Sequence, residues 1–310
     1  MTPYDAPVRH ARTDATVEDT LMMVREPAQA GLFYAASSAE CTHDLENVFR
    51  VDFATEHLPD RPLGGIVPHA GWRYSGQVAA RVFAAVAARR EPATIVVFGA
   101  VHHPIKPVAA LYGRGAWTTP LGDIRIDDRL AERILGQTTL VEDDPYANEP
   151  EHSIEVQVPL LQHRFPEARL VPIMVRPCDQ AVQVGAAVGR TVAAYDLDVV
   201  FIGSSDLTHY GPRFGFTPQG RGPDALRWAK DVNDRRVIDE MLALRADRVL
   251  AEARENQNAC GSGAIAATIA ACRELGATAG HLLAHTTSAE VAPELSSDDG
   301  AVGYAGILFS

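Results

Sequence analysis

Short apolar runs alternate along the chain with longer segments in which apolar residues recur at helical spacing. The runs are rich in Val and Ile and nearly continuous in hydrophobicity, which is typical of parallel strands covered on both faces. They predict buried strands at 63–68, 94–100, 168–175, 198–205 and 280–285.

Helical periodicity occupies the stretches between these runs. In one such stretch Ile154, Val158 and Leu161 share a helix face, and Pro159 predicts a bend in that helix. Alternating strands and helices indicate an α/β fold with a central, mainly parallel sheet flanked by helices. The predicted helices cover 75–90, 151–165, 223–244 and 261–277.

Composition and charge indicate an ordinary globular protein and argue against two classes of partner. The chain has 310 residues, 46% of them hydrophobic and 22% charged, as in ordinary globular proteins. Its net charge of −12 argues against nucleic acids and anionic membranes as partners, because both bind basic surfaces. Residues 1–24 lack the apolar core of a secretory signal and predict a flexible extension, so we expect a cytoplasmic protein without a transmembrane helix.

Histidines follow three of the predicted strands. His69 follows the first run, His102 and His103 follow the second, and Asp206 and His209 follow the fourth. Ligands of open α/β sheets bind beyond the carboxyl ends of the strands. These side chains are therefore expected to face one crevice.

A cysteine and a further histidine stand at predicted helix starts. Cys260 precedes the helix in "NACGSGAI", where the helix dipole would favour the thiolate that binds metals. His152 opens another helix, between Glu151 and Glu155.

Each of these residues also has a purely structural interpretation. A lone histidine is commonly a hydrogen-bonded structural residue, Cys260 could be a small buried hydrophobe, and Asp206 could be a helix cap. Glu151 and Glu155 could be a solvated helix start, and the aromatic residues near His69 could belong to the core. The combination of three strand-end sites with Cys260 favours a metal site or a histidine-based catalytic site.

Seven motifs occur in an order that resembles the Memo-like family, which is similar to component B of the AmmeMemoRadiSam system. They are "EPAQAGLFYAA", "IVPHAGWRYSG", "FGAVHHP", "EHSIEVQVPLLQ", "SSDLTHYG", "NACGSGAI" and "VGYAGILF". The resemblance runs from Arg25 to the C-terminus and implies a single domain over 25–310. It also implies a fold similar to that of class III extradiol ring-cleaving dioxygenases.

The resemblance implies a set of site residues. The metal ligands would be His69, His102 and Cys260, and His209 would be the catalytic acid or base, with Asp206 beside it. The metal would be one divalent ion, with Fe(II) expected first and copper or zinc as the alternatives. The expected lining of the substrate pocket comprises Phe33, Tyr74, His103, His152 and His285.

Two departures from the family pattern lie near this site. The loop before the histidine pair reads "GAV" where relatives commonly have "GPS", and His285 stands where an aromatic Tyr is common.

The expected function is a metal-dependent redox enzyme that uses non-heme iron and O₂ on a small molecule, with aromatic compounds among the candidates. The alternative is a metal- or peptide-binding adaptor that uses the same pocket without turnover. Expected partners are the small substrate and the radical-SAM and AMMECR-like components of the same system.

Overall fold

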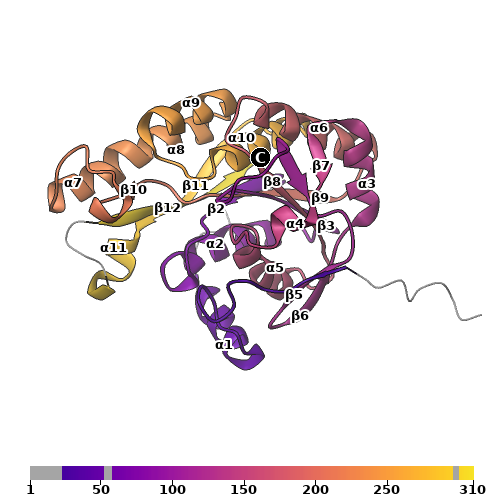
Figure 1. Ribbon diagram of the computed structural model, residues 1–310, viewed down its shortest axis with the longest axis horizontal. Coiled ribbons are helices and arrows are strands. Elements are labelled where there is room, and N and C mark those ends of the chain that lie inside the picture. The colour runs from indigo at the N-terminus through magenta and orange to yellow at the C-terminus, as the bar shows by residue number, and fades with distance from the viewer. Residues whose placement is uncertain (1–22, 52–57, 296–299) are drawn as a thin grey trace, which may run out of the picture.

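The computed structural model describes residues 23–51, 58–295 and 300–310, which form one α/β domain around a nine-stranded mixed sheet (Figure 1). Its centre consists of four neighbouring parallel strands, as the sequence predicts. In sheet order these are β2 (Gly64–Val67), β9 (Val199–Ser204), β3 (Thr94–Gly99) and β8 (Arg169–Val175). They are buried along almost their whole length, which explains their continuous hydrophobicity.

Antiparallel strands extend the sheet on the β2 side. The strand β12 (Ala301–Phe309) pairs with β2, and both β11 (Gly280–Thr287) and β10 (His209–Tyr210) pair with β12. The interpretation of 280–285 as a buried parallel strand is wrong, because β11 is antiparallel and partly exposed. On the other side, β4 (Ala109–Leu111) lies antiparallel to β8 and pairs with β7 (Val141–Asp143).

A second, three-stranded sheet consists of β1 (Val24–Arg25), β5 (Ala116–Thr119) and β6 (Gly122–Arg125). Of the predicted extension 1–24, residues 1–22 lie outside the described residues. Val24, which lies inside the predicted extension, pairs with Ala116 of β5.

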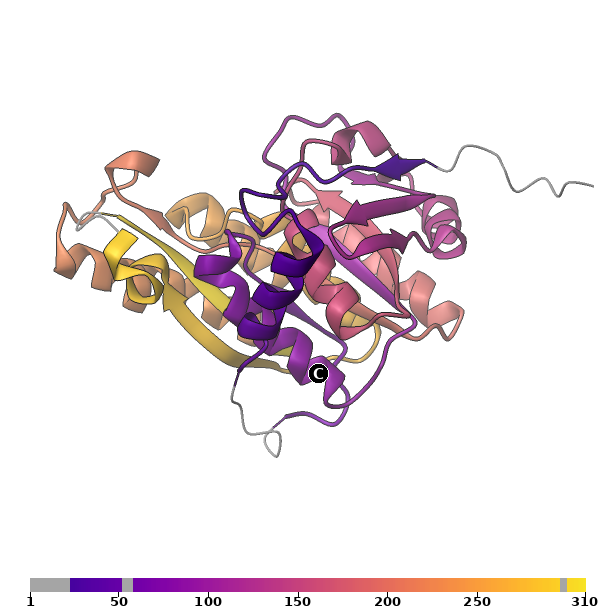
Figure 2. The ribbon, with the colours of Figure 1, turned by 90° about the horizontal axis from the view of Figure 1, so that it is seen from below.

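One face of the large sheet is covered by α2 (Trp72–Ala87), with α1 (Ser38–Val48) and α5 (Val158–Arg164) beside it (Figure 2). The helix predicted at 151–165 is divided into two segments next to Pro159. The 3₁₀ turn Glu155–Gln157 leads directly into α5, and Pro159 occupies the first turn of that helix, where its missing N–H is harmless.

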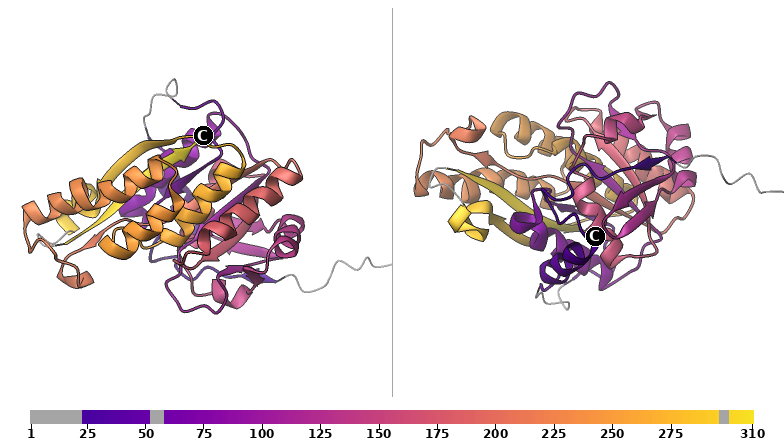
Figure 3. Two further views of the ribbon diagram at one scale, coloured as in Figure 1. Left: turned by 90° about the horizontal axis from the view of Figure 1, so that it is seen from above. Right: turned by 60° about the horizontal axis from the view of Figure 1, so that its bottom comes forward.

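The other face is covered by α10 (Ser262–Glu274) and α6 (Ala181–Ala194), with α9 (Ala246–Asn256) and α3 (Asp128–Gln137) at their sides (Figure 3). The two central helices approach closely at Gly185, where a Cβ atom would stand 2.0 Å from the carbonyl oxygen of Ala267. A core of aliphatic side chains therefore lies on each side of the sheet. The remaining short elements are α4 (Pro145–Asn148), α11 (Ser288–Val291), the 3₁₀ turn Pro212–Phe214 and the 3₁₀ turn Pro293–Leu295.

The helix predicted at 223–244 contains one widened turn. It runs as α7 (Pro223–Trp228), a π-helical segment (Ala229–Asp234) and α8 (Arg235–Leu242). Such turns often occur at functional sites, and here the widened turn ends on the buried residues Asn233 and Asp234. In the described part of the chain, no helix is both long and apolar enough to cross a membrane.

Candidate metal site and its cavity

Three adjacent strands carry the candidate side chains to one edge of the sheet. His69 follows β2, Asp206 follows β9 and His102 follows β3, and β9 lies between the other two strands. Because these strands are parallel, their carboxyl ends meet at the same edge. The sheet order therefore brings together residues that are far apart in sequence.

Three histidines form a compact cluster at this edge. The ligand atoms of His69, His102 and His152 all lie within 4.8 Å of one another. The ring centroids of His102 and His152 are 4.4 Å apart, and those of His69 and His102 are 5.1 Å apart. The cluster is a candidate three-histidine metal site, in which His152 has a place that the sequence assigned only to the pocket lining.

Hydrogen bonds fix the orientation of His69. Its Nδ1 lies 3.1 Å from Ser204 Oγ, and the Ser204 hydroxyl itself donates to the carbonyl of Ser153 at 2.6 Å. Because that hydroxyl proton is already used, the His69 Nδ1–H donates to Ser204, and the lone pair is on Nε2. Metal-binding histidines commonly have their other nitrogen held in this way.

Glu151 orients His102. Its carboxylate lies 2.8 Å from His102 Nδ1 and accepts the backbone N–H of His102 at 2.8 Å. The interpretation of Glu151 as a solvated helix start is wrong, since only 1% of the residue is exposed. Burial alone would raise the pKa of Glu151, but the hydrogen bonds and charge of His102 hold it well below its usual range. The only signal in the sequence was a carboxylate directly before His152.

The protonation states suit metal binding at two of the three histidines. Burial, together with the neighbouring imidazoles, lowers the pKa of His69 to about 3 and that of His152 to about 4. Both rings are therefore neutral at pH 7, with lone pairs available. Burial also acts to lower the pKa of His102, but Glu151 outweighs it and the pKa of His102 is raised.

Cys260 lies beside the cluster. Its Sγ is 3.2 Å from His69 Nε2 and 3.6 Å from the carbonyl oxygen of Asp206. The prediction that Cys260 is a thiolate in the metal-free protein is wrong, because burial and the carboxylate of Asp206 raise the pKa of Cys260. The helix α10 begins only at Ser262, two residues after Cys260. A bound metal cation would instead favour the thiolate form of Cys260.

We therefore expect the metal-free protein to be alkylated by iodoacetamide at Cys178 before Cys260 at pH 7.5. The reactive species is the thiolate, and the raised pKa of Cys260 makes that form rare. Cys178 is partly exposed and gives a reference thiol in the same chain. Peptide mass mapping over time measures both rates. Faster labelling of Cys260 would show that its thiolate is stabilised without a metal.

A cavity of about 490 Å³ opens above the histidine cluster. Both predicted catalytic residues, His209 and Asp206, line it together with the three histidines. Of the predicted pocket residues, Phe33, Tyr74 and His152 also line it. Its other walls are formed by Leu32, Ala70, Gly71, Arg213, Phe214, Ser288, Gly300, Ala301, Val302 and Tyr304.

Asp206 supports the loop around His69. Its Oδ1 accepts the backbone N–H of His69 at 2.7 Å and that of Ala70 at 3.3 Å. Burial raises the pKa of Asp206, although these N–H groups and the charge of His209 oppose the shift. His209 is oriented by another group, because its Nδ1 donates to the carbonyl of Leu207 at 3.1 Å. Its Nε2 is therefore the nitrogen that remains for proton exchange.

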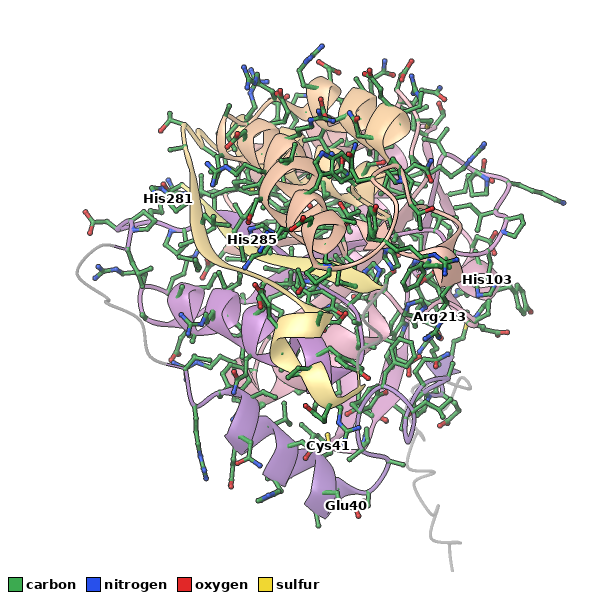
Figure 4. All side chains as sticks on the ribbon, turned by 90° about the vertical axis from the view of Figure 1, so that its left-hand side faces the viewer. Glu40, Cys41, His103, Arg213, His281 and His285 are labelled. Atoms are coloured by element: carbon green, nitrogen blue, oxygen red, sulfur yellow. The ribbon has the colours of Figure 1, made fainter. Side chains whose placement is uncertain are left out.

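Two predicted pocket residues lie outside this lining. His103 is exposed and is not among the residues that line the cavity, and neither is His285. His285 projects from β11, and its Nε2 lies 3.1 Å from Asp234 Oδ2 (Figure 4). Asp234 in turn accepts the backbone N–H of Thr208 at 2.9 Å, so this pair supports the loop that carries His209.

Comparisons with known proteins agree with the motif order. A family model described as "Memo-like protein" matches residues 25–308. A MEMO1 family protein of Thermococcus onnurineus is 38% identical over 295 residues, which cover 93% of this chain and 99% of that protein. The MEMO1 family protein MK0963 of Methanopyrus kandleri is 36% identical, again over 93% and 99% of the two chains.

Among solved structures, the uncharacterized protein JW3007 of Escherichia coli K12 is similar at a TM-score of 0.44 and 13% identity. The similarity covers 74% of this chain and 91% of that chain. The family model and the archaeal relatives both extend over nearly the whole chain. The protein therefore belongs to the Memo-like family.

Proposed function

We propose that the protein is a metal-dependent redox enzyme that binds one Fe(II) ion through His69, His102 and Cys260. Its substrate would be a small molecule, with aromatic compounds first among the candidates. The observation that carries the proposal is the shared position of two fixed imidazoles and a thiol below a cavity that also contains His209.

The spacing of the candidate ligand atoms fits one bound metal ion. Two ligands of one ion, with bonds of about 2.1 Å to nitrogen and 2.3 Å to sulfur, stand about 3.1–3.6 Å apart at the usual angles. The observed 3.2 Å between His69 Nε2 and Cys260 Sγ falls in that range. His102 has its Nδ1 occupied by Glu151, which leaves its Nε2 as the available donor. His152 is the other candidate for the third ligand, because it belongs to the same cluster.

The chain's own residues would bind the substrate and move its protons. When bound, Fe(II) with open positions supplies a site for a chelating substrate and O₂ together with the redox chemistry. Phe33 and Tyr74 present aromatic surface from the cavity wall, against which a flat ring can pack. His209 exchanges a proton with a substrate hydroxyl through Nε2, while Leu207 holds its Nδ1. An adaptor without turnover needs no such group, so the position of His209 favours an enzyme.

The test is anaerobic purification followed by reconstitution with Fe(II), Zn(II) or Cu(II) and metal analysis. O₂ uptake is then measured with a panel of catechols. Uptake that depends on both Fe(II) and a catechol supports the proposal. One bound metal without uptake for any catechol would argue against the proposed oxygen chemistry, and no bound metal would exclude the site.

We expect the variant His102→Ala to lose most of its bound metal, while His103→Ala keeps the wild-type content. The two residues are neighbours in the chain, but only His102 belongs to the cluster. Loss of a ligand, or of the residue that orients it, lowers metal affinity by at least about 10- to 100-fold. Inductively coupled plasma mass spectrometry measures the content, and Cys260→Ala and His152→Ala identify the third ligand. Equal metal content in all four variants would place the metal elsewhere.

A further inference from the structure

The cavity contains an asymmetric set of charges. Among the described residues that line it, Arg213 is the only Lys or Arg and Asp206 is the only Asp or Glu. Asp206 is 4% exposed, and one of its oxygens already accepts the N–H groups of His69 and Ala70. Among these described residues, the charged group exposed to a ligand is therefore the guanidinium of Arg213.

A defined turn presents Arg213 to the cavity. It lies in the 3₁₀ turn Pro212–Phe214, close in sequence to His209. The N–H of Phe214 donates to the carbonyl of Gly211 at 3.0 Å, and Gly211 also pairs with Phe216 as an antiparallel bridge. The two flanking glycines have φ angles of 126° and 69°, a region that other residues rarely adopt. This turn, which follows β10 and its His209, therefore fixes the backbone of Arg213, whose side chain is labelled in Figure 4 and which lines the cavity.

Arg213 makes no ion pair with any carboxylate among the described residues. Its guanidinium makes a cation–π contact with Phe214, with the guanidinium carbon 5.8 Å from the centre of the ring. Some other exposed arginines are paired, such as Arg227 with Asp224 and Arg254 with Asp179. In a chain of net charge −12, an arginine that lines a cavity and has no carboxylate partner among the described residues favours an anionic group supplied by the ligand.

We propose that Arg213 determines substrate specificity by binding an anionic group of the substrate, so that the natural substrate is a small organic acid with an apolar or aromatic body. This inference rests on the proposed function of the site. The apolar walls, formed by Phe33, Phe214 and Val302, would contact the body of the molecule, and its chelating end would lie at the histidine cluster. A guanidinium binds a carboxylate through two parallel hydrogen bonds, which an uncharged amide cannot reproduce.

The test is calorimetric titration of the Zn(II)-loaded protein with matched acids and amides. The probes are 3,4-dihydroxybenzoate against its amide and, to span a longer reach, 3-(3,4-dihydroxyphenyl)propionate against its amide. We expect at least one acid to bind about tenfold or more tightly than its amide, as charged hydrogen bonds imply. In Arg213→Gln this preference should disappear, and in Arg213→Lys it should be retained in part.

The control is Arg227→Gln, which removes the same charge from an exposed residue nearby in sequence and outside the cavity lining. It should keep the wild-type preference. Equal binding of acid and amide by the wild type, failure of both pairs to bind, or a preference that survives in Arg213→Gln would overturn the proposal. Zinc does not support redox turnover, and the titration is repeated on metal-free protein. The preference for the acid over the amide is therefore measured even if the Fe(II)-loaded protein consumes no O₂. The proposed role of Arg213 and the proposed oxygen chemistry can thus fail independently.

Discussion

The variant His209→Ala is expected to lose turnover by about 100- to 10,000-fold while keeping the metal content of the wild type. His209 lines the cavity, and its Nδ1 is held by the carbonyl of Leu207, so only Nε2 can exchange a proton with a substrate. It is not a member of the cluster formed by His69, His102 and His152. The measurement is substrate-dependent O₂ uptake by the Fe(II)-loaded protein, together with metal analysis of the same preparation.

The matched control for this prediction is His43→Ala, which removes an exposed imidazole on α1, away from the cavity. Added imidazole should restore part of the activity of His209→Ala, because the cavity is large enough to admit it. If His209→Ala loses its metal, His209 is a ligand and the assignment of an acid or base role is wrong.

The variant Glu155→Ala is expected to lower the free energy of unfolding by about 3–5 kcal/mol, because it leaves Arg25 as an unpaired buried cation. The carboxylate of Glu155 binds Arg25 Nη2 at 2.8 Å and also accepts the N–H of Gln29 at 2.7 Å and the hydroxyl of Tyr34 at 2.9 Å. Only 1% and 2% of the side chains of Arg25 and Glu155 are exposed. Urea denaturation followed by circular dichroism measures the loss.

The control is Glu149→Ala, whose side chain is exposed and which should change the stability by less than about 0.5 kcal/mol. Glu155 also anchors the segment 25–34, which carries Phe33 to the cavity wall. We therefore expect Glu155→Ala to weaken substrate binding as well as the fold. A loss of stability below about 1 kcal/mol would mean that Arg25 finds other partners.

Several parts of the site could be predicted from local sequence. The continuous apolar runs identified β2, β3 and β9, because a strand buried on both faces needs apolar residues at every position. The rule that ligands bind beyond the carboxyl ends of parallel strands then placed His69 and His102 at one edge. Their convergence also required β2 and β3 to be parallel and close in the sheet, and the structure places them on either side of β9.

Other features depended on contacts between distant segments. The run at 280–285 resembles the central strands, yet it became the partly exposed β11, because among the described strands it pairs with the antiparallel β12 alone. The carboxylate of Glu151 is adjacent in sequence to His152, but what it orients is His102, from the end of another strand. Exposure and pairing of a charged side chain depend on what packs around it, and sequence spacing does not contain that information.

By itself, then, the sequence determined the α/β class, the central strands and the presence of histidines where those strands end, since each follows from residue type and period over a few neighbouring positions. Only the tertiary structure decided that His152 joins the cluster, that His285 pairs with Asp234 outside the cavity lining and that Arg213 faces the cavity. It also decided that the pKa of Cys260 is raised, because the thiol is buried and lies near the carboxylate of Asp206. The pKa of a buried group depends on its distance to charges and water, and the tertiary packing of segments distant in sequence determines both.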